Sequence, residues 1–171
     1  MPRHLQMFAN YNRWANRLLF DAAATLTDTE YHRDMGAFFG SLHRTLDHLM
    51  VADMMWMHRF TGSGDLPQTL GIALYETLET LDAARQRLDQ RIIDWVAILD
   101  EAALSRDITY RPVTRPMEFT HPLGPTLFHL FNHQTHHRGQ CHAILTALGK
   151  PSLEMDLIYF LRGDGQEWLY G

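Results

Sequence analysis

The sequence predicts an all-α protein: a four-helix bundle with a small β-like flap before the fourth helix and a short C-terminal helix. Four long segments repeat apolar residues every three to four positions, which is the period of an amphipathic helix. The connectors between these segments are modest in length, as in helix bundles. The chain has 171 residues, of which 46% are apolar and 20% charged. This globular composition and length predict one domain over residues 1–171.

The first two helices are predicted from their apolar stripes and end signals. The first spans residues 4–26, and its apolar positions fall on one face. A connector with two glycines follows over residues 30–40. The second helix begins after Ser41, a good N-cap residue, and reaches about Phe60.

The third helix is predicted over residues 74–104, with one apolar and one charged face. We expect the charged face to be a solvated surface; it consists of Glu79, Asp82, Arg85, Arg87, Asp89, Arg91 and Asp94. Two short β-like runs within residues 108–120 predict a small flap. The fourth helix has Pro125 in its first turn and continues to Leu148. The apolar run 155–161 predicts a short helix laid on the bundle.

Eleven histidines against a single cysteine indicate that, if this chain holds a metal, imidazoles bind it. Cys141 alone excludes an intrachain disulfide and a Cys-rich zinc site, and we expect it to be a small buried apolar residue. His129, His133 and His137 recur every fourth residue on the fourth helix, so successive members lie about 40° apart around its axis. Two imidazoles at this spacing can reach one ion. His142 points away from this line.

His48 lies on the apolar stripe of the second helix and is expected to point inward. In a bundle it could meet a histidine pair of the fourth helix at one metal ion with an open coordination position. Spacing alone does not choose between His129 with His133 and His133 with His137. A buried, hydrogen-bonded His48 without any metal is the alternative.

The same residues resemble the DinB/YfiT-like family, and the match covers nearly the whole chain in order. The most specific part is the run His133-Gln134-Thr135-His136-His137-Arg138-Gly139-Gln140, followed by Leu148-Gly149-Lys150-Pro151. Supporting residues are Tyr11-Asn12-Arg13-Trp14-Ala15-Asn16, Ser41-Leu42, His48-Leu49-Met50, Asp53, Trp56 and Asp156.

This resemblance implies a four-helix bundle, commonly dimeric, that binds a divalent metal through His48, His133 and His137. We expect the metal to be zinc or nickel, with iron, copper or manganese as alternatives; three imidazoles by themselves suit zinc, nickel, copper and iron alike. Some members of the family are thiol-dependent transferases. Relatives include a thiol-dependent isomerase and proteins assigned as hydrolases, and many have no established activity.

One residue favours thiol transfer over hydrolysis. In H-E-x-x-H proteases a glutamate base follows the first histidine, whereas this chain has Gln134 there. Hydrolysis would need another base, such as Asp53, Glu118 or Asp156. Thiol transfer does not, because a coordinated thiol is deprotonated by the metal. The alternatives are a metal-dependent hydrolase and a non-catalytic, stress-related metal-binding protein.

Two further residues near the predicted site have expected roles. We hypothesise that Asp53 accepts the second N–H of a ligand histidine, as carboxylates beside metal sites do. Arg138 is expected to be a structural ion-pair partner.

Charge and hydropathy limit the partners. The formal net charge is −5, so no basic excess favours nucleic acid. No apolar stretch is long enough to span a membrane, and the N-terminus has no secretory pattern. The sequence thus predicts a cytoplasmic protein whose partner is a small molecule, such as a thiol, and the family resemblance adds a homodimer.

Overall fold

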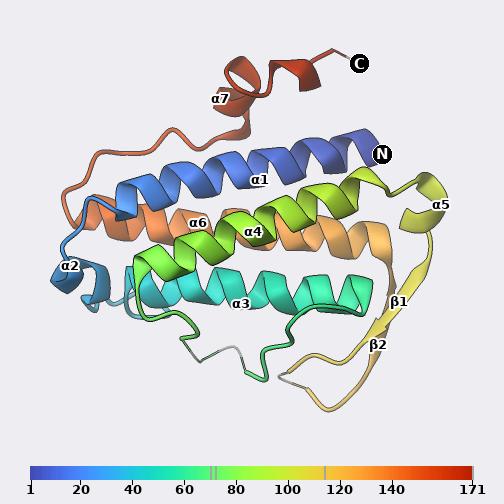
Figure 1. Ribbon diagram of the computed structural model, residues 1–171, viewed down its shortest axis with the longest axis horizontal. Helices are drawn as coiled ribbons and strands as arrows, with labels where there is room; N and C mark the ends of the chain where they lie inside the picture. The colour runs from blue at the N-terminus through green and yellow to red at the C-terminus, as the bar shows by residue number, and fades with distance from the viewer. Residues whose placement is uncertain (70, 72, 114, 171) are drawn as a thin grey trace.

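Four long helices form the bundle (Figure 1). A long connection between the second and the third of them lets these two helices run in the same direction. They are α1 (Pro2–Ala23), α3 (Leu42–Thr61), α4 (Leu78–Ala97) and α6 (Leu123–Ala147). Both α1 and α3 pack against α4 and α6. In Figure 1, α1 and α6 run in one direction, and α3 and α4 run in the other. The computed structural model describes residues 1–69, 71, 73–113 and 115–170.

Short elements complete the fold and confirm the predicted flap and C-terminal helix. The helical ones are α2 (Asp28–His32), α5 (Glu101–Leu104), α7 (Leu157–Arg162) and the 3-10 helix η1 (Gln166–Trp168). Strands β1 (Asp107–Tyr110) and β2 (Phe119–Pro122) pair antiparallel as the flap. Residue 114 of the predicted flap and residue 171 of the predicted domain lie outside the described residues. Within the described residues, none of the helices has the length and apolar character needed to span a membrane.

Capping side chains fix where the first helices begin and end. The Ser41 hydroxyl accepts a hydrogen bond from the Arg44 N–H at 3.2 Å, which confirms the predicted start of α3. Gly62 then ends α3 in a left-handed conformation, with φ 68°. The first helix ends at Ala23, three residues before its predicted end. The reason is Thr27, which forms a capping box with Glu30 and starts α2 instead.

The predicted third helix over residues 74–104 is too long at both ends. At its start, the Leu74 N–H donates to the Asp47 carboxylate at 3.0 Å, so α4 begins only at Leu78. At its end, the Asp100 carboxylate accepts from the Ala103 N–H at 2.7 Å and caps the separate helix α5. Side chains that hydrogen-bond to the backbone compete with a continuous helix. The apolar period of the sequence does not show where this happens.

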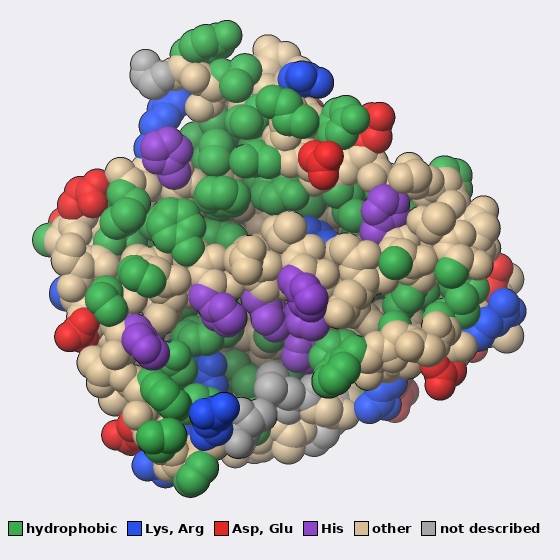
Figure 2. Space-filling view, turned by 180° about the vertical axis from the view of Figure 1, so that it is seen from behind, with side chains coloured by type: hydrophobic (Ala, Val, Ile, Leu, Met, Phe, Trp, Pro, Cys, Tyr) green, Lys and Arg blue, Asp and Glu red, His purple; other side chains and the backbone are tan. Residues whose placement is uncertain are grey.

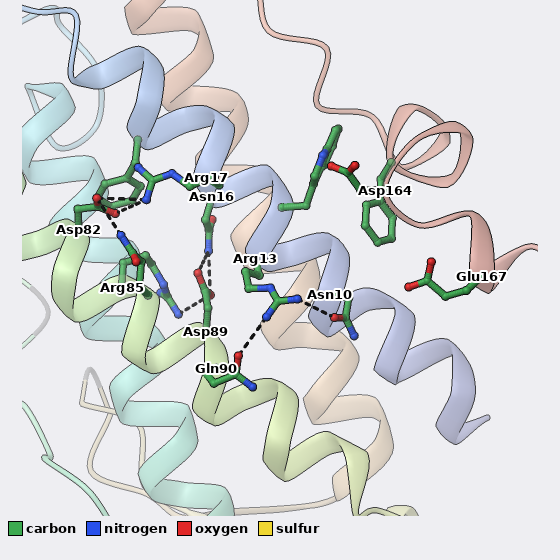
Figure 3. Close-up of a pocket in the computed structure, with 14 residues that line it drawn as sticks. Asn10, Arg13, Asn16, Arg17, Asp82, Arg85, Asp89, Gln90, Asp164 and Glu167 are labelled. Atoms are coloured by element: carbon green, nitrogen blue, oxygen red, sulfur yellow. Dashed lines mark hydrogen bonds and ion pairs between the residues drawn. The ribbon is translucent and has the colours of Figure 1, made fainter.

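The charged face of α4 is not wholly solvated, contrary to the sequence prediction. Arg85 and Asp89 are each 3% exposed. Arg85 donates to Asp53 of α3 at 2.8 Å. It also lies 3.0 Å from Asp89 (Figure 3). Helices α1 and α3 pack against this part of α4 and bury these charges, which pair with one another and with amides of α1.

The network of buried polar side chains around Arg85 and Asp89 continues into α1 and α6. Asn16 donates to the two oxygens of Asp89 at 3.1 and 3.2 Å (Figure 3). Arg138 of α6, itself 2% exposed, donates to Asn12 and Asn16 and stacks on the Tyr11 ring. Arg138 is thus a structural residue but not the expected ion-pair partner: among the described residues its hydrogen-bond acceptors are the amides of Asn12 and Asn16 and the Thr135 hydroxyl. One network of buried charges and amides therefore joins all four long helices.

Removing the cation at the centre of this network should destabilise the fold. We expect Arg85→Met to lower the free energy of unfolding by about 3–5 kcal/mol, because two buried carboxylates lose their partner. For a chain of this size the melting temperature should fall by about 10 °C. Arg17→Met is the control: Arg17 pairs with Asp82 nearby, but its side chain is 39% exposed, and the expected loss is about 0–1 kcal/mol. Equal melting temperatures for the two variants would contradict this role.

Candidate metal centre

Three histidines from two helices converge at one point. His48 comes from α3, and His133 and His137 come from α6. One ring nitrogen of each lies within 4.8 Å of the others. The two Nε2 atoms of His133 and His137 are 3.1 Å apart, and the His48 ring centroid is 4.7 Å from that of His137. Figure 2 shows the histidines gathered in the middle of one face of the molecule.

The other histidines of α6 lie outside this group. His129 is one turn away from His133, with 5.8 Å between ring centroids, and packs against Trp56. His136 is exposed and lies 3.2 Å from the Gln140 amide nitrogen. His142 accepts a hydrogen bond from the Leu153 N–H at 3.0 Å and so fastens the tail to α6. Of the two pairs that spacing left open, the structure brings His133 and His137 to His48.

The surroundings keep two of these imidazoles neutral. Burial, with the neighbouring rings of His137 and His48, lowers the pKa of His133 to about 3. Burial also lowers the pKa of His137. His137 Nδ1 donates to Gln140 Oε1 at 2.7 Å, which leaves the Nε2 lone pair of His137 facing His133. Lone pairs on neutral rings are what a metal ion requires.

Phe39 covers the cluster from the side of the connector 30–40, which the sequence analysis did not anticipate. Its ring stacks on His48 with 4.0 Å between centroids, and lies 5.6 Å from the His137 ring. A tight turn holds it there, with the Met35 N–H donating to the Gly40 carbonyl at 2.8 Å. Gly40 has φ 80°, a conformation that glycine adopts without strain. The aromatic ring shields this side of the cluster from water.

The hypothesis that Asp53 supports a ligand histidine is not what the structure shows. Asp53 is 1% exposed and its carboxylate binds Arg85 of α4. Burial raises the pKa of Asp53, and the charge of Arg85 opposes that shift. Five residues separate Asp53 from His48, which turns its side chain about 140° away around the helix. Among the described residues, Gln140 is instead the side chain that fixes a ligand histidine, at the i+3 spacing typical of helix neighbours.

Two other residues near the cluster serve the core. The Gln134 amide donates to the Leu49 carbonyl at 3.3 Å and is fully buried. Cys141 is fully buried, as predicted, and burial raises the pKa of its thiol. A neutral, inaccessible thiol is neither a ligand nor a nucleophile.

A cavity of about 170 Å³ lies against the cluster. Three histidines line this cavity, namely His48, His129 and His133. Its other lining residues are Trp56 and Arg59 of α3, together with Ala52, Met55, Pro112 and Val113. A larger cavity, of about 470 Å³, lies between α1 and α4 (Figure 3). Its buried Arg85 and Asp89 pair with each other, so we assign the chemistry to the smaller cavity.

The histidine cluster fits a single metal ion. A tetrahedral zinc with bonds of about 2.0–2.1 Å to nitrogen has ligand nitrogens about 3.3 Å apart, close to the 3.1 Å between the two Nε2 atoms of α6. Among the described residues, the group that could hold an ion contains three side chains and no fourth. Three protein ligands and an adjoining cavity are typical of catalytic rather than structural sites.

The fold and the three-histidine cluster together define a helix-bundle protein suited to hold one metal ion. A profile of the DinB family matches residues 1–168, so the chain belongs to the DinB family. It is similar to "Protein DinB" of Bacillus subtilis (strain 168), with 25% identity over 159 residues. That match covers 88% of this chain and 90% of the relative. The family resemblance inferred from the sequence is thus confirmed.

Metal content should depend on His48, His133 and His137 and on no other histidine of α6. We expect about one ion per chain after purification without a metal-affinity step, measured by elemental analysis. Replacing any of the three with alanine should weaken binding by at least about 100-fold, because loss of even a ligand's hydrogen-bond partner costs about 10- to 100-fold. His129→Ala and His136→Ala are the matched controls and should keep the ion. Loss of metal in these controls, or its retention in His133→Ala, would show that the ligand set is different.

Proposed function

We propose that this protein is a metal-dependent enzyme that joins a low-molecular-weight thiol to an electrophile. The observation that carries the proposal is the convergence of three imidazoles, two of them held neutral, beside a cavity large enough for a small molecule. A divalent ion bound there, zinc or nickel in our proposal, would supply an open position at which a thiol loses its proton.

The protein's own residues support this chemistry. Gln140 holds His137 in one orientation, and Phe39 stacks on His48 without lining the cavity. Apolar side chains of Met55 and Trp56 line the cavity and would hold the carbon part of a thiol. In the reaction a sulfur–carbon bond forms, the leaving group departs with its electron pair, and the thiol proton passes to solvent.

Hydrolysis receives less support because the carboxylates proposed as its base lie away from the cavity, which leaves His129 as the one described non-ligand imidazole in its lining. Among the described residues that line the cavity there is no carboxylate. Of the three candidates from the sequence, Asp53 is occupied by Arg85, and Glu118 pairs with Arg111 on the flap. Asp156 stands at the start of α7 and lines a different groove. A reaction whose nucleophile is a thiol does not need such a base.

A thiol-conjugation assay tests this function. Metal-loaded protein is mixed with 1-chloro-2,4-dinitrobenzene and each of a panel of small thiols, and the thioether is followed by its absorbance. We expect thiol-dependent turnover that falls at least about 100-fold in His133→Ala, since the loss of about 2.7 kcal/mol or more of transition-state stabilisation accompanies the lost ion. His136→Ala should retain it.

Other outcomes of this assay identify the alternatives. Thiol-independent cleavage of p-nitrophenyl acetate that requires His133 would indicate a hydrolase. An inert protein whose melting temperature falls sharply on metal removal would indicate a non-catalytic metal-binding protein.

The homodimer implied by the family resemblance stays a prediction, and exposed apolar side chains support it. Phe128, Ile158 and Tyr159 are 36%, 44% and 38% exposed. Figure 2 shows hydrophobic side chains gathered on the face below α7. An apolar surface of this kind is typical of an interaction site.

Sedimentation equilibrium tests the homodimer and should give twice the 19.9 kDa chain mass. Tyr159→Lys should shift the equilibrium toward the monomer. A wild-type monomer at high concentration would contradict the proposal.

A further inference from the structure

The cavity beside the histidines contains one charged side chain among the described residues that line it, Arg59. All its other lining residues are apolar or imidazole. Figure 2 shows a hollow beside the gathered histidines in which basic side chains are visible. A molecule that fills this cavity beside His48 and His133 therefore lies next to a guanidinium.

Arg59 is held in place without a carboxylate. Its Cζ atom lies 4.7 Å from the Trp56 ring and 5.2 Å from the Tyr110 ring, and its Nη2 donates to the Arg111 carbonyl at 3.3 Å. In the described part of the chain no carboxylate oxygen lies within 4.0 Å of this guanidinium, although Arg17, Arg85 and Arg111 each have one.

This arrangement leaves donors available for a ligand. A guanidinium has five N–H groups in a planar fork that matches the two oxygens of a carboxylate. One N–H of Arg59 is used by the Arg111 carbonyl, and no other hydrogen bond joins Arg59 to a described residue. Stacking on aromatic rings fixes the plane of the fork. A half-buried cation that lacks a counter-charge also gains from an anion placed beside it.

The helix geometry sets the length of such a ligand. His48 and Arg59 lie on one face of α3, eleven residues and about 16 Å apart along its axis. Arginine side chains on a helix lean toward its N-terminus, and Arg59 does so, because its guanidinium lies over Trp56 one turn earlier. The gap between the guanidinium and the imidazoles is therefore on the order of 10 Å.

We propose that Arg59 binds the carboxylate of the substrate thiol, and that this thiol has a chain of up to about five carbons between sulfur and carboxylate, because the metal–sulfur bond and the carboxylate–guanidinium contact take up part of the gap. This inference rests on the proposed thiol chemistry at the three histidines. Arg59 is then the residue that selects an acidic thiol over a neutral one of the same length, and the apolar residues between them contact its carbon chain.

A matched pair of thiols tests the proposal by binding rather than by turnover. Cobalt-loaded protein is titrated with 6-mercaptohexanoate and with 6-mercaptohexanol, and binding is followed by the sulfur-to-cobalt absorption band. We expect the acid to bind about ten-fold tighter than the alcohol or more, as one charge-assisted hydrogen-bonded pair provides. In Arg59→Met this preference should fall below about two-fold, with the affinity for the alcohol unchanged. Arg59→Gln repeats the test if the methionine variant does not fold.

Two controls separate Arg59 from general charge and from the thiol chemistry. Arg111→Met removes a positive charge from the exposed flap and should keep the preference. Calorimetry of metal-free protein with hexanoate and hexanol measures the acid site without any thiol; hexanoate should bind to the wild type and not to Arg59→Met.

The outcomes are distinct. Absence of an absorption band with either thiol, while hexanoate still binds through Arg59, would refute the proposed function and leave the acid site intact. Equal binding of acid and alcohol in the wild type, or a preference that survives in Arg59→Met, would refute the role of Arg59.

Discussion

The bundle depends on two positive and two negative side chains that are buried together. Arg85 and Arg138 are 3% and 2% exposed, and Asp53 and Asp89 are 1% and 3% exposed. Leaving one such charge without a partner costs several kcal/mol, so the helices that carry them can pack only where these groups meet. Each of the four long helices contributes a member of this network, with Asn12 and Asn16 of α1 linking Asp89 to Arg138.

The same constraint places the candidate metal centre. Arg138 follows His137 directly on α6, and Asp53 follows His48 by little more than one turn on α3. Because successive helix residues differ by 100° in direction, the network residues face the core while His48 and His133 line the cavity. The contacts that lock α3 and α6 therefore also fix the separation of the imidazoles.

The surroundings of the cluster differ from one side to the other. Phe39 closes one side with an aromatic ring stacked on His48. The cavity, which Phe39 does not line, has apolar walls and the guanidinium of Arg59 as its one charged group among the described residues. In our proposal the sulfur of a thiol lies near the imidazoles, its carbon chain against the apolar walls, and its acid at Arg59.

The sequence by itself determined the helical architecture, the flap and the spacing of His133 and His137, because these follow from local periodicity and from neighbours within one helix. Capping at Ser41 is equally local. The sequence alone could not place Phe39 over His48 or separate α5 from α4. Nor could it show that Arg85 and Asp89 are buried rather than solvated. It also could not assign Asp53 to Arg85 or Arg59 to the cavity. Those outcomes depend on which helices pack together, since burial and ion pairing are properties of residues distant in sequence. Only the tertiary structure decided them.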